Sequence, residues 1–433
     1  MRTGLDELMP LVNERGLFMS EGARRAFCPM RLVAVVAAVA CSVTFGVARP
    51  PAASAAGVQS KINALIRDAI GRHGIRAVIF QATKNGRTIM TKAYGNSQTG
   101  VPVTTNMHFR NGAVAISYMS TLLLRLVDEG KVKLDDKISK WLPNLRDSNR
   151  VTLRMLASMT AGYHDYEIDP ALIPDRLYNN PFVTITTQYQ LKLALDEPQQ
   201  FTPGTNFSYA HSNYVILGLI LSKITKLPLD VALSRMVLRP LGLKNTVASI
   251  KPPIPLPALH AYSGERGPFF NIPLRDHFFE DSTYWNPSWT LAHGAIETTD
   301  IADMTRTAIG IGSGRLLSRR LYREQIDPHI GFGHPAPTCE RCMKLNRYYG
   351  YGIGLVTNGG RGQWLLQNPL FAGEAAIESY LPSQRISIAI VTTFKPTAYN
   401  AQGNPSPYWQ VLWAKIGKVL APRDAPAVPP GVG

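Results

Sequence analysis

The strongest constraint on the fold is a pair of strand-forming segments near each end of the sequence. The segment IRAVIFQATKNGRTIMTKAYG (75–95) has two apolar, β-branched runs joined at Asn85-Gly86, which favours a two-residue hairpin turn. The segment AAIESYLPSQRISIAIVTTF (375–394) has two more runs around a Pro-Ser-Gln turn. Between the two pairs, apolar spacing predicts helices over 115–129, 152–158, 188–195 and 212–225, and another precedes the first pair at 58–72. We therefore expect an α/β (α+β) fold with an antiparallel sheet of N- and C-terminal strands and a large helical region inserted between them.

Composition limits the function classes. The 433 residues are 45% hydrophobic and 18% charged, which is typical of a globular protein with a large core. The net charge is +16, but the basic residues are scattered and form no arginine-rich arm. This pattern argues against a nucleic-acid partner and favours solubility with weak affinity for anionic envelope surfaces.

The N-terminus carries the pattern of a secretory signal peptide. Three arginines precede the apolar run LVAVVAAVACSVTFGVA (32–48), and Ala53-Ser54-Ala55 offers a small-residue cleavage site. An uncleaved anchor is the alternative, but the run is short for a spanning helix and Pro50-Pro51 ends it. We therefore expect residues 1–56 to be a signal peptide, without a stable transmembrane span, and the protein to be secreted or in the cell envelope. Translation starting at Met19 or Met30 fits the pattern better than Met1.

The cysteines suggest a disulfide and, as an alternative, a metal site. Cys339 and Cys342 lie in TCERC, whereas the other two cysteines lie in the expected signal peptide. In an oxidising compartment we expect a local disulfide between this pair. A zinc site of His329, His334, Cys339 and Cys342 is the alternative, although the histidine spacing matches no common ligand pattern. No metal and no other cofactor are predicted.

Several segments, in a fixed order, resemble one enzyme family. The segment FRNGAVAISYMSTLLLRLVDEGKVKLDDKISKWLPNL resembles the nucleophile helix of the serine β-lactamase-related family, which includes class C β-lactamases, D-alanyl-D-alanine carboxypeptidases and esterases. VTLRMLASMTAGYHDY, FTPGTNFSYAHSNYVILGLI, RPLGLKNT, GAIETTDIADM and YYGYGIGL are similar to later landmarks of that family. The resemblance covers about residues 60 to 400 and implies the β-lactamase/transpeptidase-like fold. We expect this domain over 57–415, followed by a Pro-rich disordered tail over 416–433.

The resemblance implies three catalytic motifs, and each is altered here. The family's S-x-x-K serine falls on Ala113 and its lysine on Ile116. In the Y-x-N motif Tyr209 is retained, whereas His211 takes the place of the asparagine. The third motif, which helps to build the oxyanion site, falls on Gln367-Asn368-Pro369, where the proline removes a backbone N–H from the strand.

Other residues are weak substitutes for the missing serine. Ser117 and Ser120 lie on the same predicted helix without a lysine partner, so we interpret them as core or helix-lining hydroxyls. Tyr209 and His211 could form an acid/base pair, because histidine titrates near neutral pH, but a packed remnant tyrosine is the simpler interpretation. His164 and Asp165 are assigned to the surface of a loop.

The sequence therefore predicts an exported β-lactamase-fold protein that has lost acyl-serine catalysis. It would bind a small-molecule or cell-wall-derived ligand, or a protein partner. The alternative is an esterase, carboxypeptidase or acyltransferase with an active site rewired around Tyr209 and His211. A structural envelope protein with a closed cleft is a third possibility.

Overall fold

The computed structural model describes residues 52–276, 278–327, 342, 349–357 and 362–429. These residues belong to one unit, Pro50–Gly433. Its strands are β1 Ile75–Lys84, β2 Arg87–Gln98, β3 Val101–Pro102, β4 Phe109–Arg110, β5 Val247–Ala248, β6 Tyr262–Ser263, β7 Glu280–Asp281, β8 Glu297–Thr299, β9 Gly354–Val356, β10 Trp364–Gln367, β11 Leu370–Phe371, β12 Glu374–Leu381 and β13 Ile386–Phe394.

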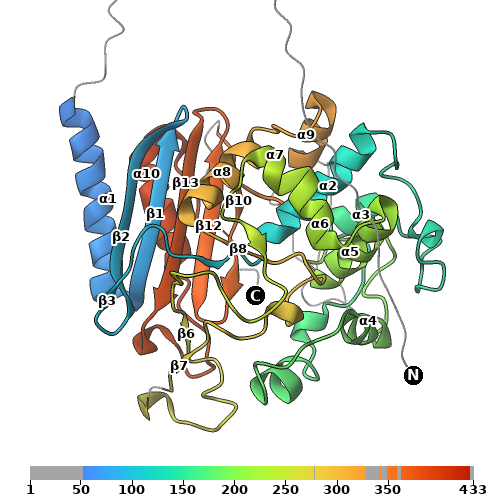
Figure 1. Cartoon of the computed structure of the whole chain (residues 1–433), viewed down its shortest axis with the longest axis horizontal. Coiled ribbons are helices and arrows are strands. Elements are labelled where there is room, and N and C mark those ends of the chain that lie inside the picture. Colours follow the sequence, from blue (N-terminus) through green and yellow to red (C-terminus); the bar gives the residue numbers. More distant parts are fainter. Residues whose placement is uncertain (1–51, 277, 328–341, 343–348, 358–361, 430–433) are drawn as a thin grey trace, which may run out of the picture. The chain divides into compact units, whose positions relative to one another are not determined.

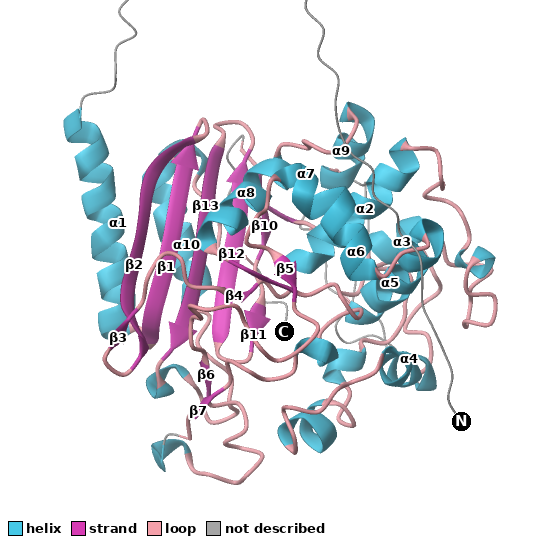
Figure 2. Cartoon of the chain, viewed as in Figure 1, coloured by secondary structure: helices cyan, strands magenta, loops and turns pink. Residues whose placement is uncertain are grey.

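Helices separate the N- and C-terminal strands along the chain (Figure 2). The α-helices are α1 Ala52–Arg72, α2 Val114–Asp128, α3 Leu153–Ala157, α4 Thr187–Asp196, α5 His211–Thr225, α6 Leu229–Leu233, α7 Arg239–Leu241, α8 Ile301–Gly312, α9 Arg319–Ile326 and α10 Tyr408–Leu420. Short 3-10 or π turns are η1 Ile138–Lys140, η2 Tyr166–Ile168, η3 Ile173–Tyr178, η4 Ser234–Leu238, η5 Leu274–Asp276, η6 Pro287–Trp289, η7 Pro396–Ala398 and η8 Pro422–Asp424.

The main sheet joins the two ends of the chain, which confirms the predicted fold class. Its order is β3-β2-β1-β13-β12-β10-β9, with β11 pairing β12, and every pairing is antiparallel. Strand β1 pairs β13 from Ile75↔Phe394 to Lys84↔Ile386. The predicted Asn85-Gly86 turn is confirmed, because both residues have positive φ (51° and 74°), as a type I′ hairpin requires.

The two faces of the sheet bury two separate apolar cores. Helices α1 and α10 pack together against one face, around Phe80, Trp364 and Trp413, whereas α8 covers the other face (Figure 1). That second face belongs to the larger core, which continues into the helical region around α2 and α5. Layers on both faces explain why all nine residues of β13 are buried, as expected for a central strand.

The end of the chain differs from the predicted disordered tail. Helix α10 continues to Leu420, and Asp424 then accepts hydrogen bonds from the Gly362 N–H (2.9 Å) and, through its backbone carbonyl, from the Trp364 indole (2.8 Å). Pro426 and Pro429 are buried, and Pro426 packs beside Gly417 of α10, whereas Pro422 is exposed, so the described part of the expected tail, up to residue 429, packs on the domain. Among the described residues no helix is long and apolar enough to cross a membrane.

Candidate functional site

The start of α2 is held by a buried polar clamp. Asn111 donates to Oε2 of the Glu297 carboxyl group (2.8 Å) and accepts from the Glu297 backbone N–H (3.0 Å), while its own N–H donates to the Glu297 carbonyl (3.0 Å). Strand β4, immediately before Asn111, pairs with β8, which carries Glu297. These bonds fix Ala113, the N-cap residue of α2, whose methyl group cannot accept the capping bond that a serine hydroxyl would.

The residues of the first and third family motifs lie against each other. Gly112 has φ of +50°, and a Cβ there would lie 2.6 Å from the Pro369 Cβ, so only glycine fits beneath this proline. Pro369 is buried and lies in the break between β10 and β11, not within a strand as the sequence suggested. The backbone nitrogen of Pro369, which carries no hydrogen, therefore lies in that break. The proline ring packs on Gly112, the residue before Ala113.

Gln367 connects the same motif to the middle of α2. Its amide donates to the Gly352 carbonyl (2.6 Å). A Cβ on Gly352 would lie 2.7 Å from the Ile116 carbonyl oxygen and 2.3 Å from Ser120 Oγ, so this glycine packs directly on the helix. Ile116 itself is 0% exposed and belongs to the larger core. The tertiary structure thus brings together the sequence-predicted positions 113, 116, 367 and 369.

The two serines of α2 are structural, as interpreted from the sequence. Both are fully buried. Ser117 Oγ donates to the Val114 carbonyl (2.7 Å), and Ser120 Oγ bonds the Tyr214 hydroxyl (2.7 Å), which also donates to the Ala157 carbonyl (2.8 Å). Hydroxyls committed to such bonds inside the core are poorly placed to attack a substrate.

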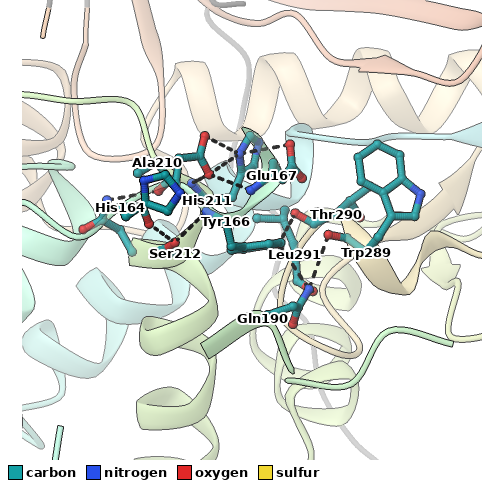
Figure 3. A network of polar contacts seen from close by, with 12 residues as sticks. His164, Tyr166, Glu167, Gln190, Ala210, His211, Ser212, Trp289, Thr290 and Leu291 are labelled. Atoms are coloured by element: carbon teal, nitrogen blue, oxygen red, sulfur yellow. Dashed lines mark hydrogen bonds and ion pairs between the residues drawn. The ribbon is translucent and has the colours of Figure 1, made fainter. Parts of the chain in front are cut away.

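His211 lies at the start of α5 between two carboxylates (Figure 3). Its backbone N–H donates to Asp165 Oδ1 (3.0 Å). Its Nδ1 lies 3.2 Å from the same oxygen and 3.1 Å from Glu167 Oε2. Asp165 is 3% exposed, so it is shielded from solvent. Carboxylates on Nδ1 favour a proton on that nitrogen, which in the neutral ring makes Nε2 the acceptor.

The loop that supplies both carboxylates is fastened to the same helix. Ser212 Oγ donates to the His164 carbonyl and accepts from the Tyr166 N–H (3.3 Å). The Tyr166 hydroxyl donates to the Thr290 carbonyl (2.8 Å), and the buried Gln190 amide donates to that hydroxyl (3.1 Å), as Figure 3 shows. These bonds position residues 164–167 relative to His211.

Assigning His164 and Asp165 to a loop surface was wrong. The assignment considered only local sequence, whereas the contact partner lies 46 residues further along the chain. No local pattern could reveal this pairing, because residues 166–168 form the 3-10 turn η2 and Asp165 is its N-cap. The functional neighbours missed by sequence reasoning are therefore Asp165 and Glu167.

Tyr209 forms an aromatic wall beside His211. Its ring is nearly perpendicular to the His211 ring at a centroid distance of 5.1 Å and to the Tyr349 ring at 5.8 Å. Burial raises the pKa of Tyr209 well above its usual value, and the nearby Tyr349, Glu167 and Asp165 raise it further. Tyr209 is therefore a neutral phenol at neutral pH, and the aromatic pair contributes apolar contact surface.

Three buried glutamates lie on nearby strands, Glu297 on β8 and Glu374 and Glu378 on β12. Glu374 accepts from the Arg110 N–H (3.0 Å), and burial raises its pKa to about 8 despite the opposing charge of Arg110. Burial also raises the pKa of Glu378 to about 8, and that of Glu297 well above its usual range. At neutral pH burial thus favours the protonated forms of Glu374 and Glu378, which reduces the negative charge on the sheet side of the site.

The predicted metal alternative falls almost entirely outside the described residues. His329, His334 and Cys339 lie outside them. Cys342 is disulfide-bonded, and each of the other three cysteines lies outside the described residues. Within the described ranges no group of histidine, cysteine, aspartate and glutamate side chains could hold a metal ion.

Comparison with known proteins gives one family. The sequence profile of the Beta-lactamase family matches residues 62–408. A putative D-alanyl-D-alanine carboxypeptidase of Salmonella typhimurium is 25% identical over 40% of this chain and 44% of its own length. Penicillin-binding protein 4 of Amycolatopsis lactamdurans is 31% identical over 39% of this chain and 43% of its own. The chain thus matches less than half the length of these curated relatives.

Solved structures show the same fold. A D-amino acid amidase from Ochrobactrum anthropi SV3, complexed with D-phenylalanine, superposes with a TM-score of 0.67 and 21% identity, covering 84% of this chain and 98% of that one. A D-stereospecific amidohydrolase from Streptomyces superposes with a TM-score of 0.65 and 22% identity, covering 79% and 94%. At this identity the likeness concerns the fold.

Proposed function

The chain belongs to the Beta-lactamase family, a family of β-lactamase-fold serine hydrolases, and we propose that it binds a ligand at the family's site without acyl-serine turnover. The single observation that carries this proposal is the start of α2. By the sequence resemblance, the methyl group of Ala113 takes the position of the family's nucleophile, and the buried Ile116 takes that of its activating lysine. Without the oxygen and the ammonium, no acyl-enzyme forms there.

The surrounding framework favours retained binding. Gly112 packs beneath Pro369, Gln367 holds the Gly352 loop on α2, and Tyr209, the retained residue of the second motif, flanks the start of α5. Replacing lysine by isoleucine also has a physical reason once the serine is gone. An unpaired ammonium in the core would cost several kcal/mol, whereas an aliphatic side chain costs nothing of this kind.

We propose that the ligand contains D-amino acid residues, as cell-wall peptides do. The sequence relatives named above include a putative D-alanyl-D-alanine carboxypeptidase, and a D-amino acid amidase and a D-stereospecific amidohydrolase share this fold. The half-buried rings of Tyr209 and Tyr349 would provide the apolar contact surface, and His211 a polar group beside it.

The proposal predicts stereoselective binding without a covalent product. Titration calorimetry with a peptide ending in D-Ala-D-Ala should show binding that its all-L counterpart lacks. Tyr209→Ala should weaken it about tenfold, because loss of an aromatic contact costs on the order of 1–2 kcal/mol. The matched control Tyr284→Ala, which removes an exposed tyrosine, should not. A fluorophosphonate or a β-lactam should leave the protein mass unchanged, and a stoichiometric adduct would refute the loss of acyl-serine chemistry.

The position of His211 favours a second candidate function. A histidine with carboxylates on Nδ1 resembles the base and orienting groups of a hydrolase, and Nε2 could activate a water molecule directly. In that case an ester or amide would be hydrolysed without any covalent adduct, and His211→Gln would abolish turnover. Peptide turnover of this kind in the experiment above would replace the binding proposal by this one.

We also infer that the protein is exported. The support is the charged segment, apolar run and Ala53-Ser54-Ala55 pattern of the N-terminus. Helix α1 begins at Ala52, so cleavage after Ala55 would remove only its first turn and leave the part that packs on the sheet. N-terminal sequencing of the mature protein should begin close to Ala56. A start before Leu32, with the apolar run intact, would contradict export by cleavage.

A further inference from the structure

A basic hollow lies at the far end of α2 from the family's site. It has a volume of about 310 Å³ and is lined by Lys131, Val132, Lys140, Trp141, Lys223 and Ile224. Ala113 directly precedes α2 and Lys131 follows it, so the 15-residue helix separates the two places by roughly 22 Å. The volume is at the lower end of the range for small-ligand sites.

The lining combines clustered positive charge with an apolar floor. Lys131, Lys140 and Lys223 come from three different segments, and all three are exposed. Val132 is 5% exposed, while Trp141 and Ile224 are partly buried against the larger core. The Lys140 ammonium lies 5.0 Å from the centre of the Trp141 ring.

The nearby acidic residues offset only part of this charge. Glu129 lies 2.7 Å from the Lys131 ammonium, and Asp136 lies 3.7 Å from that of Lys140. Exposed lysines also stand at 133, 137 and 226 in the two flanking segments, whereas Asp135 is paired with Arg154 (2.8 Å). The remaining positive charges repel one another. A polyanionic surface placed against them would relieve this repulsion, which favours binding to such a surface.

We propose that this hollow docks the protein on an anionic membrane, with lipid phosphate groups between the three lysines. Phosphate satisfies ammonium groups, and an indole among lysines matches the interfacial preference of tryptophan. The alternative is that the lysines merely complement the C-terminal dipoles of α2 and α5. That alternative explains Lys131 and Lys223 but not Lys140 or the tryptophan floor. The proposal is independent of what the family's site binds.

The test uses the full chain and two matched triple variants. Lys131→Gln/Lys140→Gln/Lys223→Gln removes the hollow's charge, and Lys61→Gln/Lys84→Gln/Lys418→Gln removes the same charge from exposed lysines elsewhere. Co-sedimentation with phosphatidylglycerol vesicles should fall on the order of 100-fold for the first triple, because each lysine near an anionic surface contributes about fivefold. The second triple should change it only a few fold. Both triple variants keep residues 1–51, so any vesicle binding by that segment contributes equally to the two measurements.

Further measurements identify the source of the phosphate and the role of Trp141 in the apolar lining of the hollow. Trp141→Ala should weaken vesicle binding more than Trp141→Phe, because phenylalanine keeps an apolar ring. Four results would overturn the proposal: equal losses in both triples, equal binding to phosphatidylcholine vesicles, displacement from vesicles by soluble glycerol phosphate, or lowered thermal stability with unchanged vesicle binding. Displacement by soluble glycerol phosphate would show that the hollow binds a free phosphate ligand. Lowered stability with unchanged vesicle binding would show that the lysines serve the helix dipoles.

Discussion

Replacing Ala113 by serine and Ile116 by lysine together is expected to give a protein that a fluorophosphonate labels covalently. Serine at 113 would stand at the N-cap of α2, and lysine at 116 lies three residues later on the same helical face. Each single change should restore little, because the hydroxyl and its activating amine act as a unit. Intact-mass spectrometry should show labelling at least about tenfold faster in the double variant than in either single variant.

The structure also predicts what limits this restored reaction. Ile116 is 0% exposed, so an ammonium there costs several kcal/mol, and the double variant should unfold at a lower temperature. Adding His211→Asn, which restores the family's Y-x-N motif, should increase the labelling rate. The matched control Ala113→Ser/Ile116→Met has the hydroxyl without the ammonium and should remain unlabelled. If this control were labelled as fast as the double variant, a lysine at position 116 would not be needed to activate the serine.

Stability is expected to fall as the pH rises from about 5 to about 8. Glu378 and Glu374 have folded-state pKa values of about 8, against 4.5 for an ordinary glutamate. Between these values the unfolded chain releases protons that the folded protein keeps, so the free energy of unfolding decreases with rising pH. The dependence is steepest, at about 1.4 kcal/mol for each pH unit and carboxyl, where the unfolded chain is ionised and the folded protein is not. Below about pH 4.5 both states are protonated and the dependence disappears.

Glu378→Gln isolates one of these groups. Burial is the only cause that raises the Glu378 pKa, so a neutral amide of the same shape should remove its share of the pH dependence. Denaturant unfolding should find this variant more stable than the wild type at pH 9 and similar to it at pH 5. Glu197→Gln, on an exposed glutamate, is the matched control and should leave the slope unchanged. A Glu378→Gln variant with the wild-type slope would mean that this carboxyl is ionised in the folded state.

Local sequence signals determined the main elements. The Asn85-Gly86 pair specified the first hairpin because its positive φ values are a property of those two residues alone. Apolar spacing placed α2 within one residue at each end, since a helix buries one face at a fixed period. The residues at the motif positions were also readable, because Gly112 and Gly130 bracket the helix and, by the resemblance, assign the family's serine position to Ala113 and its lysine position to Ile116.

Only the tertiary structure decided the environment of the site. Asp165 reaches His211 across 46 residues, and Pro369 covers Gly112 across a far longer separation, so neither contact has a local signature. The raised pKa of Glu378 depends on its burial within the sheet layer, and the Asp424 backbone carbonyl accepts from the Trp364 indole 60 residues earlier in the chain. Residue identity determined which side chains stand at the positions that the resemblance assigns to catalysis, because that is a property of single positions. Burial, charge and hydrogen bonding of the groups that remain depend on which distant segments fold against them.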